Sequence, residues 1–251
     1  MNALKRLAKD QATIIALLAL VAIFSLARPK FFTLGNLFNI LDLISLVSIS
    51  SVAMCFVLMM GSIDLSVEGV MGLTSIIAGY LVKNLVNSND FGFFAFPICA
   101  AVGGAFGLLS GVMVTRLKIP SFMTTLGIGF ISSGIGVLIA KGTPIVITDW
   151  SYRSIAISRF GPIPAIFIVS IIIILLAWLV NQRTILGRHI IAIGGDESIV
   201  KDVGVNTDRV KRLVFVIAGA LYGFAGALLT GKLGSGDISA PLGFTFDSIG
   251  S

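Results

Sequence analysis

Long apolar runs alternate with short polar intervals along almost the whole chain. Each complete run is close to the roughly 20 residues that a helix needs to cross a bilayer. We therefore predict an all-α fold, a polytopic helical bundle in a membrane, forming one transmembrane domain over residues 1–251. The pattern gives about seven complete transmembrane segments and the start of an eighth, at residues 11–27, 36–60, 65–82, 91–115, 121–140, 162–180, 213–231 and from 244 onward.

The composition agrees with a membrane protein and excludes other classes. Hydrophobic residues make up 56% of the chain and charged residues 12%, whereas soluble domains carry about 25% charged residues. The net charge of +6 comes from basic residues at segment ends, so it does not indicate a nucleic-acid partner. Cys55 and Cys99 lie in apolar runs, as small buried side chains do. With His189 as the single histidine, we predict no metal site, no cofactor and no catalytic His set.

The longest polar interval, Asn181 to Arg212, holds ten of the thirty charged residues. It separates two apolar runs, so we expect it to lie in water, where a soluble partner could bind. Basic residues set the orientation: with the N-terminus inside, the inner loops hold eleven and the outer loops seven. This places the interval in the cytoplasm and Lys141–Phe160 outside, where Trp150 and Tyr152 indicate an interfacial segment.

The N-terminal run also resembles a signal peptide, because basic residues precede it. An uncleaved first transmembrane helix is the better interpretation, since the run is long and Arg28-Pro29-Lys30 follows at once.

Within the cytoplasmic interval, local signals predict a short surface helix between glycine hinges. Gly194-Gly195 breaks the chain, Asp196 can cap two helical turns over Glu197–Val203, and Gly204 can end them in a left-handed conformation. Asn206 or Thr207 then caps the next helix, with Asp208 in its first turn.

Two uses of this short helix remain open from the residues alone. It could lie on lipid headgroups, with Lys201 and Arg209 facing phosphates. It could equally insert into a groove on another protein, through Ile199, Val200 and Val203.

Small residues spaced four apart predict close helix packing. Gly103, Gly107 and Gly111 form one such line, and Gly219 and Gly223 form another. Packing is the simpler interpretation, and lining a permeation path is the alternative.

Asp64 and Glu68 also allow two interpretations. They could form a polar patch at the mouth of a path or a proton or cation site. We favour the other interpretation, in which Asp64 caps the third helix and Glu68 interacts with its positive end. Residues 226–233 match a phosphate-binding loop through Lys232, but Leu233 replaces the required Ser or Thr. We therefore predict no nucleotide site in this chain.

Four motifs, in order along residues 30–250, resemble bacterial ABC importer permeases of the ribose/xylose/autoinducer-2 class. They are Gly61–Val67 (GSIDLSV), Pro120–Gly127 (PSFMTTLG), Gly187–Asp196 with the following Gly204-Val205, and Ala240–Phe244 (APLGF). The chain departs from the family pattern at Ser62 and Glu68, where Gly is usual, and at Asp196, where Asn is usual. The family's chains also continue through further membrane segments beyond the position of Ser251, so a mature chain ending there is expected not to transport.

The resemblance implies a multi-pass protein of the bacterial cytoplasmic (inner) membrane, surrounded by lipid, with a cytoplasmic N-terminus. Its expected partners are cytoplasmic ABC ATPase subunits, a second permease chain forming a homo- or heterodimer, and an extracytoplasmic solute-binding protein. Residues 181–212 would be the ATPase-coupling loop, with the contact carried by Gly187, Arg188, Gly194, Gly195, Asp196, Glu197, Ile199, Val200 and Gly204.

The implied cargo is a monosaccharide or a similar small polar solute, and ATP hydrolysis would occur on the partner chain. The alternative is an ion-coupled secondary transporter, which would need ionisable residues near the bilayer midplane. The central segments carry almost none.

Overall fold

The computed structural model describes residues 12–28 and 30–250, which are mainly helical. The chain divides into two compact units, Met1–Leu41 and Asp42–Ser251. The helices are α2 (Ala12–Ala27), α3 (Leu34–Met59), α4 (Val67–Leu81), the 3-10 turn η1 (Gly92–Phe94), α5 (Ala95–Arg116), α6 (Ser121–Ala140), α7 (Trp150–Ile157), α8 (Ala165–Arg183), α9 (Ile185–Gly195), α10 (Glu197–Asp202), α11 (Thr207–Leu233) and α12 (Phe244–Gly250). Four two-residue strands complete the list: β1 (Ile145–Val146), β2 (Arg159–Phe160), β3 (Ile163–Pro164) and β4 (Ser235–Gly236).

Five of the described helices are long and apolar enough to cross a membrane: Leu34–Met59, Gly92–Arg116, Ser121–Ala140, Ala165–Arg183 and Thr207–Leu233. The predicted all-α membrane bundle is therefore confirmed, but seven complete spans are not. The first predicted run gives a shorter apolar helix, Ile14–Ala27, and the eighth gives only α12. Residues 1–11, where the first run begins, lie outside the described residues.

The third run differs for a local reason. Gly61 has a φ of 74° and the next five residues are not helical, so α4 begins only at Val67 and has 15 residues. A helix of that length rises about 22 Å, less than the roughly 30 Å of a hydrocarbon core.

Helix α4 is the centre of the second unit. Eleven of its residues are buried, and it packs against α5, α6 and α11. Close approach requires glycine: a Cβ on Gly69 would overlap the Gly129 backbone of α6, and one on Gly226 would overlap Met71 and Thr74 of α4. Ser75 and Thr230 also share a buried hydrogen bond of 2.8 Å between α4 and α11.

The two glycine lines bring α5 and α11 together, so the packing interpretation is confirmed. A Cβ on Gly103 would overlap the Gly219 carbonyl oxygen, and one on Gly107 would overlap that of Phe215. Gly223 meets the carbonyl of Cys99, and Gly111 meets the backbone of Arg212.

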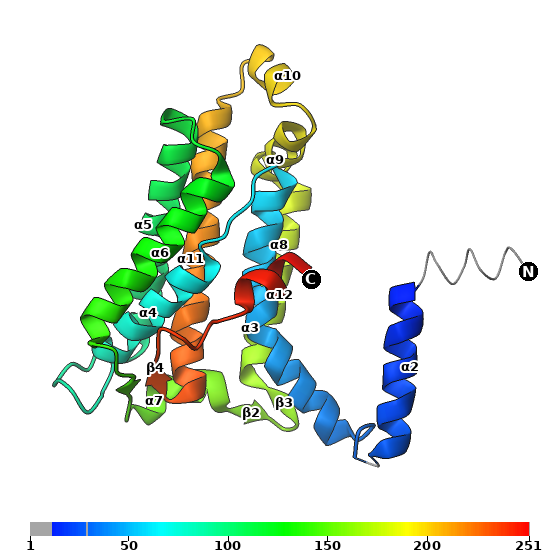
Figure 1. Cartoon of the computed structure of the whole chain (residues 1–251), viewed down its shortest axis with the longest axis vertical. Helices are drawn as coiled ribbons and strands as arrows, with labels where there is room; N and C mark the ends of the chain where they lie inside the picture. Colours follow the sequence, from blue (N-terminus) through cyan, green and yellow to red (C-terminus); the bar gives the residue numbers. More distant parts are fainter. Residues whose placement is uncertain (1–11, 29, 251) are drawn as a thin grey trace, which may run out of the picture. The chain divides into compact units, whose positions relative to one another are not determined.

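Within the second unit, α9 and α10 lie at one end and α7, β2 and β3 lie at the other (Figure 1). At that second end, β1 pairs antiparallel with β4, and β2 pairs with β3. Tyr152, one of the two aromatic residues that suggested an interfacial segment, faces the interior of the protein. Its ring is fully buried and its hydroxyl donates to the Ala227 carbonyl at 2.6 Å, so α7 is bound to α11, whereas Trp150 is exposed.

Candidate functional site

Helix α9 occupies much of the first half of the polar interval Asn181–Arg212. The Thr184 hydroxyl accepts from Gly187 N at 3.2 Å and caps the helix. One face is buried through Gly187, Ile190 and Ile193, while Arg188 is exposed. The apolar residues of α9 fall on one helical face, which packs on the protein while the other face stays exposed.

Gly194 and Gly195 do not break the chain, so the predicted hinge at this position is wrong. Both belong to the last turn of α9, and the chain leaves the helix at Asp196. Gly194 packs directly on the carbonyl of Met59 at the end of α3, where a Cβ would overlap the oxygen. A Cβ on Gly195 would meet none of the described atoms within 4 Å. Gly194 is thus the contact between α9 and α3.

Asp196 caps α10 as predicted. Its Oδ1 accepts from Ser198 N at 2.8 Å and from Ile199 N at 3.3 Å. The hydrogen bond from the Ser198 hydroxyl, followed by the two amide bonds, lowers the pKa of the Asp196 carboxyl. Gly204 has a φ of 85°, as expected for the residue that ends this helix. Of the two candidate caps for α11, Asn206 is the one used, accepting from Arg209 N at 3.0 Å.

Glu197 ties α10 to α11, a role that the sequence did not reveal. Its carboxylate pairs with Lys201 at 2.9 Å on its own helix and with Lys211 on α11, and it accepts from the Thr207 hydroxyl at 3.1 Å. Partial burial alone would raise the pKa of Glu197, but the hydrogen bonds from Lys211 and Lys201 outweigh it and lower that pKa to about 2. Lys201 is therefore engaged in an ion pair within the chain.

The outer face of α10 presents two large apolar side chains. Ile199 is 61% exposed and Val203, just after the helix, is 73% exposed. Val200 points inward and is buried. A short, capped helix with an exposed apolar pair is a shape that fits a groove on a partner.

Asp64 does not cap α4 as predicted, whereas Glu68 lies in the first turn of that helix, as expected. Asp64 is buried, and its Oδ1 accepts from Ser66 N at 2.9 Å and from the Ser66 hydroxyl at 2.6 Å. It therefore closes a turn just before α4, and Ser66 holds the cap position. Glu68 lies in the first turn of α4, but its Oε1 accepts from Gly243 N at 3.0 Å and Thr245 N at 3.3 Å, which fastens the start of α12. The residues do not share a helix face because only Glu68 is helical.

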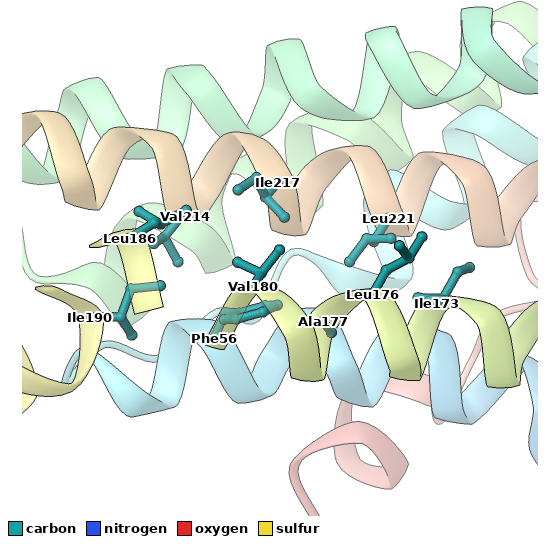
Figure 2. Close-up of a pocket in the computed structure, with 10 residues that line it drawn as sticks. All are labelled: Phe56, Ile173, Leu176, Ala177, Val180, Leu186, Ile190, Val214, Ile217 and Leu221. Atoms are coloured by element: carbon teal, nitrogen blue, oxygen red, sulfur yellow. The ribbon is translucent and has the colours of Figure 1, made fainter. Parts of the chain in front are cut away.

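An apolar cavity of about 160 Å³ lies beside α9, bounded by α8, α9, α11 and Phe56 of α3. Figure 2 shows Val214, Ile217 and Leu221 of α11 facing Val180 and Leu176 of α8. All ten lining side chains are hydrocarbon, so this cavity offers a polar solute no hydrogen-bonding group. Among the described residues, no three His, Cys, Asp or Glu side chains are grouped as a metal site would require.

Comparisons with known proteins agree with the membrane architecture. A family model described as "Branched-chain amino acid transport system / permease component" matches residues 36–251. The ribose import permease protein of Escherichia coli K12 is 33% identical over 245 residues, covering 96% of this chain and 75% of that protein. The ribose import permease of Bacillus subtilis is 28% identical, covering 94% and 72%, and the galactose/methyl galactoside import permease of Escherichia coli K12 is 27% identical, covering 95% and 75%. No solved structure matches.

Proposed function

Because the chain belongs to the family of branched-chain amino acid transport system permease components, we propose that it is the transmembrane subunit of an ATP-binding-cassette importer. It resides in the bacterial inner membrane and forms part of the path for a monosaccharide or a similar small polar solute. Separate ATPase subunits supply the energy from the cytoplasm. An extracytoplasmic binding protein delivers the solute, and a second permease chain completes the path.

The observation that carries this proposal is the construction of α10. The Asp196 cap, the Glu197 ion pairs and the Gly204 turn hold a six-residue helix at one end of the bundle, with Ile199 and Val203 exposed. We infer that ATPase subunits grip this apolar pair. The proposed orientation, with α10 and the N-terminus in the cytoplasm, follows from the excess of basic residues on that side.

The sugar class rests on the relatives, whose names specify ribose and galactose import. The family description names branched-chain amino acids, so leucine is the informative competitor. An ion-coupled secondary transporter is not favoured, since the buried Asp64 and the partly buried Glu68 are both occupied by hydrogen bonds that fix local structure.

The proposal is tested in proteoliposomes that contain the permease, its ATPase subunits and its binding protein. We expect uptake of labelled ribose or galactose that depends on ATP and is not displaced by leucine. Replacing both Ile199 and Val203 by Glu should remove ATPase binding and uptake. The matched control places the same two Glu residues at the exposed Leu85 and Val86, remote from α10 in sequence. Uptake that survives ATPase inactivation and collapses with an uncoupler would overturn the importer assignment.

A further inference from the structure

Residues 62–66, which join α3 to α4, are not helical, and their polar side chains face the protein. Burial alternates along the segment: Ser62, Asp64 and Ser66 are buried, whereas Ile63 between them is 43% exposed. Two backbone N–H groups of the segment donate to hydroxyls of α6 at 3.1 and 2.9 Å, which fixes this alternation. The segment therefore holds a carboxyl group inside the bundle.

The Asp64 carboxyl has no positively charged partner. The residue is 1% exposed, and none of the ion pairs formed among the described residues includes it. Both hydrogen bonds that it accepts come from Ser66, one from the amide and one from the hydroxyl, and both end on Oδ1. A side chain this deeply enclosed leaves no surface on which a further group could neutralise its charge.

The elements packed around Asp64 add no counter-charge. Helix α6 contains no titratable residue. In α4, Glu68 is acidic and is bound to amides at the start of α12. In α5, the Cys99 thiol donates to the Thr74 carbonyl, and in α3, Cys55 is exposed. The basic residues of α5 and α11 lie near the ends of these helices.

Tyr222 of α11 is the remaining titratable group beside Asp64. Gly226, one turn later in α11, packs on Met71 of α4, so Tyr222 lies level with the start of α4. Its hydroxyl interacts electrostatically with the Asp64 carboxyl. The Tyr222 hydroxyl is fully buried and has no hydrogen-bond partner among the described residues. It therefore donates no hydrogen bond that would stabilise a negative charge on Asp64.

Two other aspartates of the chain make the same turn in more exposed positions. The Oδ1 atoms of Asp196 and Asp237 each accept from the amide and the hydroxyl of the serine two residues later. These bonds lower the pKa of the exposed Asp196. At Asp64, burial raises the pKa of the carboxyl and is the largest influence, ahead of the lowering by Ser66. Because the turn is the same, burial is what sets Asp64 apart.

We propose that Asp64 carries a proton in the folded protein, and that its neutral carboxyl allows residues 62–66 to lie inside the bundle. A proton suits this site better than a metal ion, since it needs one oxygen, whereas Mg²⁺ and Ca²⁺ take about six or more ligands. No three His, Cys, Asp or Glu side chains are grouped for a metal among the described residues. The proton is part of the folded structure and is not a coupling ion, so the inference does not depend on the importer assignment.

Loss of this proton should loosen the join between α3 and α4, because an ionised carboxylate favours water. The segment follows Met59, on whose carbonyl Gly194 packs, so its release would also free the end of α3 that bears α9. The sign of the pH effect follows from linkage. Burial raises the pKa of Asp64 above its unfolded value of about 3.9. The stabilisation by the bound proton is therefore complete below that value and is lost as the pH rises through the folded pKa.

Infrared spectroscopy of the purified permease, with isotope-labelled aspartate carboxyls, distinguishes a carboxylic acid from a carboxylate. At about pH 7 exposed aspartates are ionised. We expect the wild type to retain a carboxylic-acid carbonyl band at this pH, and Asp64→Asn to lose it. The matched control is Asp237→Asn, which removes a carboxyl from the same kind of turn at a more exposed position and should keep the band.

Thermal unfolding in detergent over a range of pH gives a second readout. The Asn side chain is neutral, like the protonated Asp64, and keeps an oxygen for Ser66. Between the unfolded and the folded pKa of Asp64, the unfolding constant of the wild type should therefore rise by up to about tenfold per pH unit relative to that of Asp64→Asn. Asp237→Asn should follow the wild type.

Equal acid bands in the wild type and Asp64→Asn at about pH 7, or equal pH dependence of their unfolding, would overturn the proposal. If Asp64→Asn does not fold, the wild type alone decides. Its acid band must then persist at a pH where exposed aspartates have lost theirs, and complete loss of the band together with theirs would show that Asp64 is ionised.

Discussion

The contact between Gly194 and Met59 makes a sharp prediction about neighbouring glycines. A Cβ on Gly194 would lie 2.0 Å from the Met59 carbonyl oxygen and 3.1 Å from its carbon. Ordinary contact begins near 3.4 Å, so Gly194→Ala must separate α9 from the end of α3 by about 1.4 Å. The obstacle is backbone and cannot rotate away. Gly195→Ala adds the same methyl group in the same helical turn, where it meets none of the described atoms.

Overpacking of this kind costs about 1–3 kcal/mol, whereas Ala in place of Gly within a helix gains up to about 1 kcal/mol. We expect Gly194→Ala to be the less stable of the two variants by about 2 kcal/mol. For a chain of this size that difference corresponds to roughly 4–8 °C in Tm. Thermal unfolding in detergent measures it.

Function should separate the two variants as well. Gly194→Ala moves α9 relative to α3, so solute uptake per ATP hydrolysed should fall, while Gly195→Ala should resemble the wild type. Equal melting temperatures and equal ratios of uptake to ATP hydrolysis for the two variants would refute the view that Gly194 is a packing contact between α9 and α3.

Three further predictions concern α10 and the core. Glu197→Gln should raise the rate of amide hydrogen exchange in α10 by about fivefold, as expected for loss of roughly 1 kcal/mol from a partly exposed ion-pair network. The control variant Asp202→Asn should leave that rate unchanged, because Asp202 has no partner among the described residues. Because the pKa of Glu197 is lowered to about 2, its contribution is complete above about pH 4.5 and is lost as the pH falls toward 2. A spin label at the exposed position 203 should become mobile in that pH range in the wild type. If the same change in mobility occurs in a Glu197→Gln chain, protonation of Glu197 is not its cause. In the core, Gly103→Ala should lower Tm strongly because its Cβ overlaps the Gly219 carbonyl, whereas Gly104→Ala, with its nearest neighbour at 3.6 Å, should change little.

Features that depend on nearby residues could be predicted from the sequence. Asp196 caps a helix two residues away, and Gly204 adopts the left-handed conformation that this position requires. The glycine lines of α5 and α11 were also recognisable, because a four-residue spacing fixes one helix face whatever lies opposite. In each case the residues that allowed the prediction lie within a few positions of one another.

Features with distant partners could not be predicted. Glu68 accepts from amides 175 and 177 residues further along the chain, and Lys232 pairs with Asp42 at 3.3 Å across 190 residues. From the sequence, Glu68 was expected to interact only with the positive end of its own helix, α4. The predicted third run began at Leu65, whereas α4 begins at Val67. Just before the helix, Ile63 N and Leu65 N donate to the Ser121 and Thr125 hydroxyls of α6, contacts that a local pattern does not show.

If a partner pushes on α10, as proposed, the contacts of α10 transmit that push to two parts of the protein. Through Glu197 and Lys211, α10 is tied to α11, and α11 is locked to α5 by glycine contacts that leave no room for sliding. Through α9 and Gly194, the same segment bears on the end of α3, which borders cavities on the side facing α8. A rigid core resists displacement, whereas a helix beside empty volume yields. Motion driven at α10 should therefore appear mainly as movement of α3 and α8 against a fixed α4–α5–α11 core.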